Sequence, residues 1–183
     1  MKKYAAWFLC ASVAALPVSS FAHAPKTVAP PAPPPFTDSD TTFAESATEV
    51  NTFEIEISQL ATAQAKRQKV KDLAADLVKQ HTDNQNKLSA LALQHGLELN
   101  KDMSTDEQQI IDRLKTEKGH RFDRDYLDIQ AQAHSDALAM FQNEAESASD
   151  PDLKSYASAT ADATQAHLND ALKLGAKKPT ATH

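Results

Sequence analysis

Apolar side chains recur every three or four residues along four long stretches of the chain, which is the spacing of an amphipathic α-helix. We expect long helices over about 40–66, 69–95, 122–148 and 151–174, and a shorter helix over 105–118. No stretch alternates apolar and polar residues as a half-buried strand would. The pattern predicts an all-α fold, an up-down-up-down four-helix bundle with one short extra helix between the second and third long helices.

Local signals mark the ends of these helices. A serine or threonine three residues before a glutamate, the spacing of a capping box, occurs at Thr42 and at Ser104 and predicts two helix starts. Asp150 followed by Pro151 offers an N-cap acceptor and then a proline at the first helical position. Gly96 is expected to end the second long helix in the left-handed conformation.

Each long helix carries one ionisable residue on or beside its apolar stripe. These residues are Glu54, His81, His134 and His167. Since an α-helix rises by a nearly constant amount per residue, the sequence distance from a turn gives a height. Glu54 and His81 lie almost equally far from a turn at Arg67, and His134 and His167 lie almost equally far from Asp150. Gly96 and Gly119 mark ends of the second and third long helices that we expect to lie together. His81 and His134 lie equally far from these two glycines. The four side chains are therefore predicted to form one layer inside the bundle.

Three imidazoles and a carboxylate are ligands that suit Zn(II), Fe, Mn or Cu. The layer of Glu54, His81, His134 and His167 thus predicts a site for one transition-metal ion, zinc or iron. The alternative is a buried hydrogen-bond cluster, in which Glu54 pairs with a protonated histidine and fixes the register of the helices.

Other chemistry has less support in the sequence. A di-iron carboxylate centre needs a glutamate three residues before two of its histidines. Val78, Ala131 and Thr164 occupy the positions three residues before the histidines of the layer. There is also no glycine-rich phosphate loop and no Gly-x-Ser-x-Gly motif, so no catalytic residue is assigned.

The N-terminal region reads as a targeting segment followed by a linker. Residues 1–22 combine two lysines, a short apolar run and small residues at a cleavage site, which predicts a signal peptide and a mature start at His23. Residues 23–35 contain six prolines and are expected to form an extended linker, either a spacer or simply a disordered terminus. The bundle is expected over 36–175, and residues 176–183 form a polar tail that we expect to be disordered.

Composition narrows the choice of partners. The only cysteine, Cys10, lies in the predicted signal peptide, so the mature chain would have no disulfide and no thiolate site. Removal of that peptide takes away two lysines and leaves 17 basic against 25 acidic side chains. We therefore expect no nucleic-acid partner and no adhesion to anionic lipid. No transmembrane segment remains after the signal peptide, and peripheral association with the envelope and the oligomeric state stay open.

Several segments carry a resemblance to a known family. They are Phe43, Glu54 and 59–61 in the first helix, 70–74, 77–78 and His81 in the second, and Phe122, Asp123, Tyr126, His134, His167, Leu168 and Ala171 in the last two. Over 36–174 the chain resembles the DUF4142 family of exported bacterial proteins, which are grouped with ferritin-like four-helix domains and often labelled outer-membrane proteins. The resemblance implies that fold and an envelope location, but no activity defines the family.

The leading interpretation is a non-enzymatic, exported protein of the periplasm or cell envelope that binds a metal ion in its core. Two alternatives stay open. One is a metalloenzyme that acts on a small oxidant or substrate inside the bundle. The other is an interaction module tethered to the envelope by the proline-rich segment.

Overall fold

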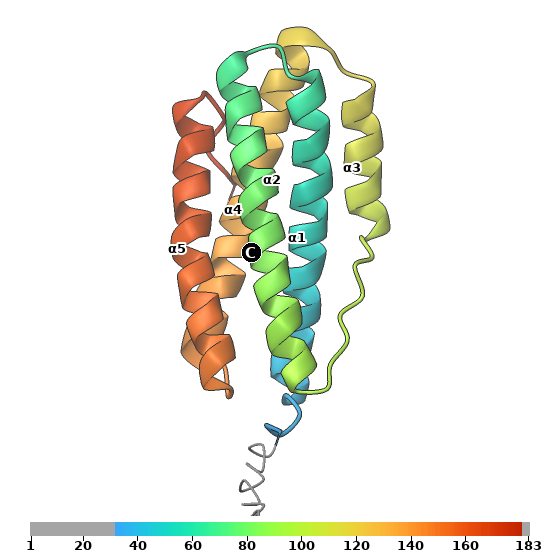
Figure 1. The fold of residues 1–183 in the computed structure, drawn as a ribbon. Helices are drawn as coiled ribbons and strands as arrows, with labels where there is room; N and C mark the ends of the chain where they lie inside the picture. Colours follow the sequence, from blue (N-terminus) through green and yellow to red (C-terminus); the bar gives the residue numbers. More distant parts are fainter. Residues whose placement is uncertain (1–31, 181–183) are drawn as a thin grey trace, which may run out of the picture. The chain divides into compact units, whose positions relative to one another are not determined.

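The computed structural model describes residues 32–180, whose regular structure is entirely helical (Figure 1). The helices are α1 (Asp38–Gln64), α2 (Gln68–Gln94), α3 (Thr105–Lys115), α4 (Gly119–Ser147) and α5 (Pro151–Lys173). This confirms the all-α prediction. The predicted signal peptide and most of the proline-rich linker lie outside the described residues, as do residues 181–183. Within 32–180, no helix is both long and apolar enough to cross a membrane.

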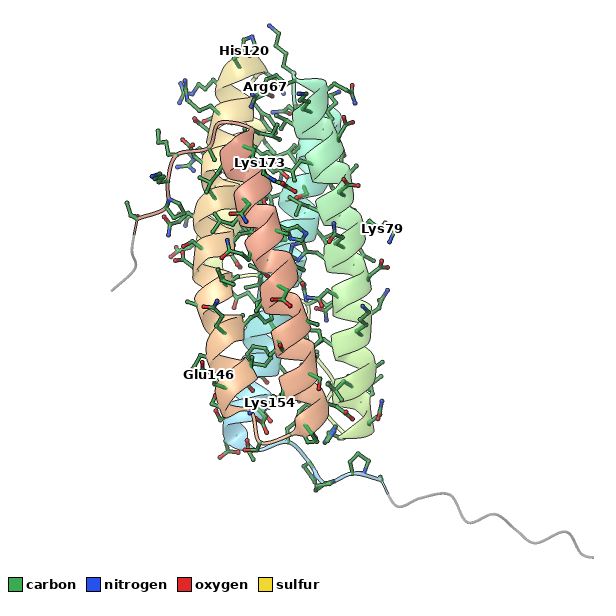
Figure 2. The ribbon with its side chains drawn as sticks, turned by 90° about the vertical axis from the view of Figure 1, so that its left-hand side faces the viewer. Arg67, Lys79, His120, Glu146, Lys154 and Lys173 are labelled. Carbon is green, nitrogen blue, oxygen red and sulfur yellow. The ribbon has the colours of Figure 1, made fainter. Side chains whose placement is uncertain are left out.

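Hydrogen bonds show which helix ends share one end of the bundle. Asp123, near the start of α4, accepts from the backbone N–H groups of Lys66 and Arg67 in the α1–α2 turn, at 2.7 and 2.9 Å. The Arg67 guanidinium donates to the carbonyl of Leu174, just after α5, at 2.9 Å. Figure 2 shows Arg67 and His120 near this same end. The α1–α2 turn, the start of α4 and the end of α5 therefore lie together.

The opposite end gathers the remaining termini. Asp40, in the first turn of α1, accepts from the Ser149 backbone N–H between α4 and α5 at 3.1 Å. His95, just after α2, lies 3.5 Å from the carboxylate of Asp150. The start of α1, the end of α2 and the α4–α5 turn therefore share this end.

These contacts correct the predicted topology. α2 and α4 run in the same direction, so the four long helices are arranged up-down-down-up and the up-down-up-down prediction was wrong. The connection over 95–104 and then α3 carry the chain back along the outside of the bundle before α4 begins (Figure 1). One long crossover of this kind is found in ferritin-like folds.

The prediction that His81 and His134 lie at the same level remains correct, but for a different reason. α2 and α4 both start at the end of the bundle that holds the α1–α2 turn, and His81 and His134 lie at similar distances along their two helices from that end. Because the rise per residue is nearly constant, both histidines sit near mid-height of the bundle.

Most helix ends follow the local signals. The capping box at Ser104 is present, Asp150 caps α5, and Gly96 adopts a φ of 76° after α2. The predicted box at Thr42 was wrong. α1 starts earlier, capped by the Thr37 hydroxyl, and the Thr42 hydroxyl donates instead to the carbonyl of Asp38 inside the helix.

Buried apolar residues form two clusters, one toward each end of the bundle. The first includes Phe53, Ile57, Leu77, Phe122 and Tyr126, near the α1–α2 turn. The second includes Phe43, Leu88, Leu91, Phe141 and Leu153, near the α4–α5 turn. Buried polar side chains lie between them on all four long helices: Asn51, Glu54, His81, Gln85, Gln130, His134, Thr164 and His167. The core is therefore divided by a polar layer, and this layer contains the predicted site.

Candidate metal centre

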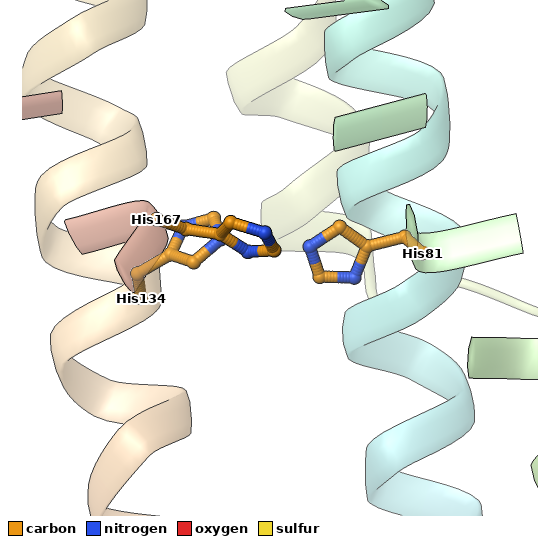
Figure 3. A group of neighbouring side chains, drawn as sticks. All are labelled: His81, His134 and His167. Carbon is orange, nitrogen blue, oxygen red and sulfur yellow. The ribbon is translucent and has the colours of Figure 1, made fainter. Parts of the chain in front are cut away.

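Three histidines from three helices converge in the polar layer. His81 of α2, His134 of α4 and His167 of α5 face one another (Figure 3), with ring centroids 5.1 to 5.5 Å apart. One ring nitrogen of each lies within 4.8 Å of one from each of the others. The residues are 5%, 2% and 7% exposed. Within residues 32–180, this is the one group of histidine and acidic side chains spaced to hold a metal ion.

The proton on His81 is placed by a network of amides. Its Nδ1 lies 2.9 Å from the side-chain oxygen of Asn51. The Asn51 amide nitrogen donates to Gln85 at 3.1 Å, which turns the Asn51 oxygen toward the imidazole. Gln85 in turn donates to the Thr48 hydroxyl at 3.3 Å. His81 therefore carries its proton on Nδ1 and donates it to Asn51, so Nε2 is left with a lone pair.

The other two rings are oriented by carbonyl oxygens as well. Nδ1 of His134 lies 2.9 Å from the backbone oxygen of Gln130, which can only accept, so the proton is on Nδ1. Nε2 of His167 lies 3.0 Å from the side-chain oxygen of Gln80 and donates to it. His134 Nε2 and His167 Nδ1 are then the nitrogens with lone pairs.

These three nitrogens have no hydrogen-bond partner in the described part of the chain. They are His81 Nε2, His134 Nε2 and His167 Nδ1. All three are acceptors, and no donor lies among them. Metal-ligating histidines usually have this arrangement, with the second ring nitrogen donating to a carbonyl or carboxylate oxygen.

Protonation does not supply the missing donor at neutral pH. Burial lowers the pKa of His134 and of His167 to about 4. Burial also lowers the pKa of His81 well below its ordinary value, and the charge that would form on either neighbouring histidine lowers it further. The cluster thus presents three neutral imidazoles, the form that binds metal ions.

Glu54 reaches the same layer from α1 but lies behind His134. Its Oε1 is 3.6 Å from His134 Nδ1, the nitrogen bonded to Gln130, and not on the side of the unpartnered Nε2. Its Oε2 accepts from the Gln130 amide at 2.8 Å. Burial raises the pKa of Glu54 to about 8, so Glu54 and His134 are both neutral at pH 7 and form no ion pair. The structure therefore brings three of the four predicted residues together and places the fourth beside one of them.

A metal ion would need only a small closure of the three rings. Metal–nitrogen bonds of about 2.0–2.1 Å around a tetrahedral ion correspond to nitrogen–nitrogen separations of about 3.4 Å. The present separations reach at most 4.8 Å, so side-chain rotations of modest size would bring the donors into range.

The sequence did not point to the groups that orient the rings. Asn51 and Gln130 lie one helical turn before Glu54 and His134 on buried faces, and that spacing was the only available signal. Gln80 is exposed and carries no such signal.

Comparison with known proteins now places the chain. The model of the DUF4142 family, described as a domain of unknown function, matches residues 25–174. The chain belongs to the DUF4142 family. A comparison of this DUF4142 protein with curated proteins finds no significant match.

Solved structures of other proteins share the fold of this DUF4142 protein. A DUF305 fragment from Deinococcus radiodurans is 14% identical, with a TM-score of 0.70 over 77% of this chain and 97% of that chain. A DUF305 protein from Streptomyces coelicolor is 18% identical, with a TM-score of 0.68 over 79% and 97%. CopM in its Cu(II)-bound form is 17% identical, with a TM-score of 0.65 over 74% and 94%, and CopM is also known in an Ag-bound form. At these identities the likeness establishes the fold alone.

Proposed function

We propose that this DUF4142 protein binds one divalent transition-metal ion through His81, His134 and His167 in the interior of its helical bundle. The observation that carries the proposal is the set of three buried imidazole nitrogens that face one another with no donor between them. Buried acceptors without a partner are costly, and a cation would satisfy all three at once. A buried hydrogen-bond cluster would instead place a donor opposite each acceptor.

The donor set favours Cu(II) or Zn(II). Imidazole suits both ions, and affinity for nitrogen sites generally peaks at Cu(II) among the divalent ions of the first transition row. Within residues 32–180, the cluster consists of histidines alone and includes no thiolate, a soft ligand that selects Cu(I). CopM, a structural relative described with Cu(II) bound, gives independent support for copper in a bundle of this fold.

Glu54 is proposed as a supporting residue and not as a ligand. It stands 3.6 Å from the Nδ1 of His134. The Gln130 backbone oxygen already accepts the Nδ1 proton of His134 and orients the ring, and a positive ion on Nε2 would favour the ionised form of Glu54 beside it, which would increase the basicity of His134.

Metal analysis tests the proposal. Protein treated with a chelator and equilibrated with Cu(II) or Zn(II) near pH 7 should retain one ion per chain after dialysis. His81→Gln, His134→Gln and His167→Gln should each lower the affinity at least 100-fold, because each removes one of three ligands. His120→Gln is the matched control, since His120 is exposed near the first turn of α4 (Figure 2). The assignment would be refuted if the wild-type protein retained no stoichiometric metal. It would also be refuted if the variant with all three histidines replaced by glutamine bound the metal as tightly as the wild type.

We propose further that the protein is exported to the periplasm or cell envelope. The support is the predicted signal peptide over residues 1–22 and the implied envelope location of the family. Protein recovered from the envelope fraction should begin at His23 by N-terminal sequencing. Recovery of the full-length chain from the cytosol would contradict this.

A further inference from the structure

The seam between α1 and α4 carries an apolar groove that none of the three clustered histidines lines. α3 packs against both helices, and the groove lies beside the first turns of α3. Its volume is about 430 Å³, which is in the range of small-molecule sites. Most of the lining is apolar, from Val50, Phe53, Ile110, Ile129, Ala133, Ala137 and Met140.

The apolar walls of the groove are not fully covered by the protein itself. Phe53 and Ala137 are buried, whereas Val50, Ile110, Ile129 and Met140 are only half-buried. These four side chains come from α1, α3 and α4 and meet around one space. An apolar molecule in that space would remove their remaining surface from water, which is favourable in proportion to the area covered.

Two carboxylates without a matching cation lie where α3 begins, at the edge of the groove. Glu107 lines the groove, and its Oε2 accepts from the Ser104 backbone N–H at 3.0 Å. Glu49 accepts from the same N–H at 3.0 Å, so the two carboxylates converge on one donor. Within residues 32–180, neither forms an ion pair with a lysine, arginine or histidine. Burial raises the pKa of Glu107, and the negative charge of Glu49 raises it further.

The other polar groups of the lining add no positive charge. Asp136 is acidic and accepts from Gln132 at 3.1 Å. Gln132 is engaged by the segment after α5, since it accepts from the Thr180 backbone N–H at 3.0 Å and donates to the Thr180 carbonyl at 3.2 Å. Glu54, in the inner wall, is neutral at pH 7 in the metal-free protein. An anion would therefore be repelled from this groove and an ammonium group attracted to it.

We infer that the groove between α1, α3 and α4 binds a small organic cation, an amine whose apolar body lies against the groove walls and whose ammonium group lies beside Glu107 and Glu49. The walls supply the affinity for an apolar body, and the two carboxylates supply the preference for positive charge. The histidine cluster takes no part in this site. The inference is therefore independent of the proposed metal binding and applies to the metal-free protein.

Probes of similar shape and different charge test the inference on chelator-treated protein. They are phenethylamine, which is positive at pH 7, hydrocinnamate, which is negative, and phenethyl alcohol, which is neutral. In a titration followed by nuclear magnetic resonance, phenethylamine should bind in a saturable way and roughly tenfold or more tighter than either other probe, a difference of about 1.4 kcal/mol. Absence of saturable amine binding would overturn the inference. Equal binding of the amine and the alcohol would also overturn it, because the groove would then bind apolar molecules without regard to charge.

Two pairs of variants locate the bound amine. Ala133→Leu fills the groove and should weaken phenethylamine binding roughly tenfold or more, whereas Ala139→Leu, exposed on α4 outside the groove, should not. Glu107→Gln removes a charge but keeps the capping box, in which glutamine also serves, and should weaken binding roughly tenfold. Glu56→Gln is its control, since Glu56 is exposed on α1 and does not line the groove. Equal affinities within either pair would overturn the inference.

Discussion

Glu54→Gln should remove a large pH dependence from the stability of the metal-free protein. Burial raises the pKa of Glu54 from its ordinary value of 4.5 to about 8. The folded protein therefore binds one more proton than the unfolded chain between these two values. The stabilising contribution of the neutral carboxyl is complete below pH 4.5 and is lost as pH rises through 8. Glutamine stays neutral throughout, and its side-chain oxygen can still accept from the Gln130 amide.

The size of the effect follows from the shift in pKa. One pKa unit corresponds to about 1.36 kcal/mol, so a shift from 4.5 to about 8 corresponds to about 5 kcal/mol over the whole range. Between pH 5 and pH 8 the wild-type protein should lose about 3–4 kcal/mol relative to Glu54→Gln. That is a large part of the roughly 5–15 kcal/mol that stabilises a typical domain.

The buried histidines act in the opposite direction and cancel in the comparison. The pKa of His134 is lowered from 6.5 to about 4, so its contribution is complete above pH 6.5 and is lost as pH falls toward 4. Both proteins contain this residue. Urea unfolding of chelator-treated wild type and Glu54→Gln at pH 5, 6, 7 and 8 gives the difference directly. Parallel stability curves across this range would show that Glu54 ionises normally in the folded protein, and the reasoning would fail.

Two further substitutions test two different features. One is the metal site, and the other is the pair of hydrogen bonds between Asp123 and the α1–α2 turn at the end of the bundle. Asn51→Ala removes the acceptor that holds the His81 proton and should weaken Cu(II) or Zn(II) binding roughly 10- to 100-fold. Asn143→Ala is the control, since Asn143 is exposed on α4, and it should leave the affinity unchanged in the same titration. Equal affinities in the two variants would rule out the orienting role of Asn51. Asp123→Asn leaves one oxygen to accept from the two backbone N–H groups of the α1–α2 turn. The free energy of unfolding, measured in urea, should fall by about 2–3 kcal/mol, and the number of metal ions bound per chain should not change. A change in the free energy of unfolding below about 0.5 kcal/mol would mean that the hydrogen bonds of Asp123 are not a significant source of stability.

The sequence was informative wherever a helix could be treated by itself. The spacing of apolar residues gave the helices, and distance from the turn at Asp150 gave the common level of His134 and His167, because rise per residue is nearly constant. The count that related His81 to His134 assumed that Gly96 and Gly119 share an end of the bundle, which was wrong, and the two histidines lie at one level because both are near the middle of their helices. The direction of α4 relative to α2 could not be predicted in this way. The connection between α2 and α4, which contains α3, is long enough either to turn back or to cross the bundle, and periodicity does not distinguish the two.

The position of Glu54 shows a second limit. A stripe of apolar residues identifies the buried face of a helix but not which neighbour a side chain meets within that face. Glu54 is at the right level and still lies on the Nδ1 side of His134, because small rotations about the helix axis decide such contacts. Gln80 was beyond prediction, since an exposed glutamine on a helix is an ordinary surface residue.

The crossover by α3 has a consequence for the whole bundle. It divides the chain into two helical hairpins, α1–α2 and α4–α5, and each packs far more closely within itself than against the other. His81 belongs to the first hairpin, whereas His134 and His167 belong to the second. An ion held by all three would act as a crosslink between the halves, so its removal would be felt along the whole α2–α5 seam, as faster amide hydrogen exchange on both hairpins at once.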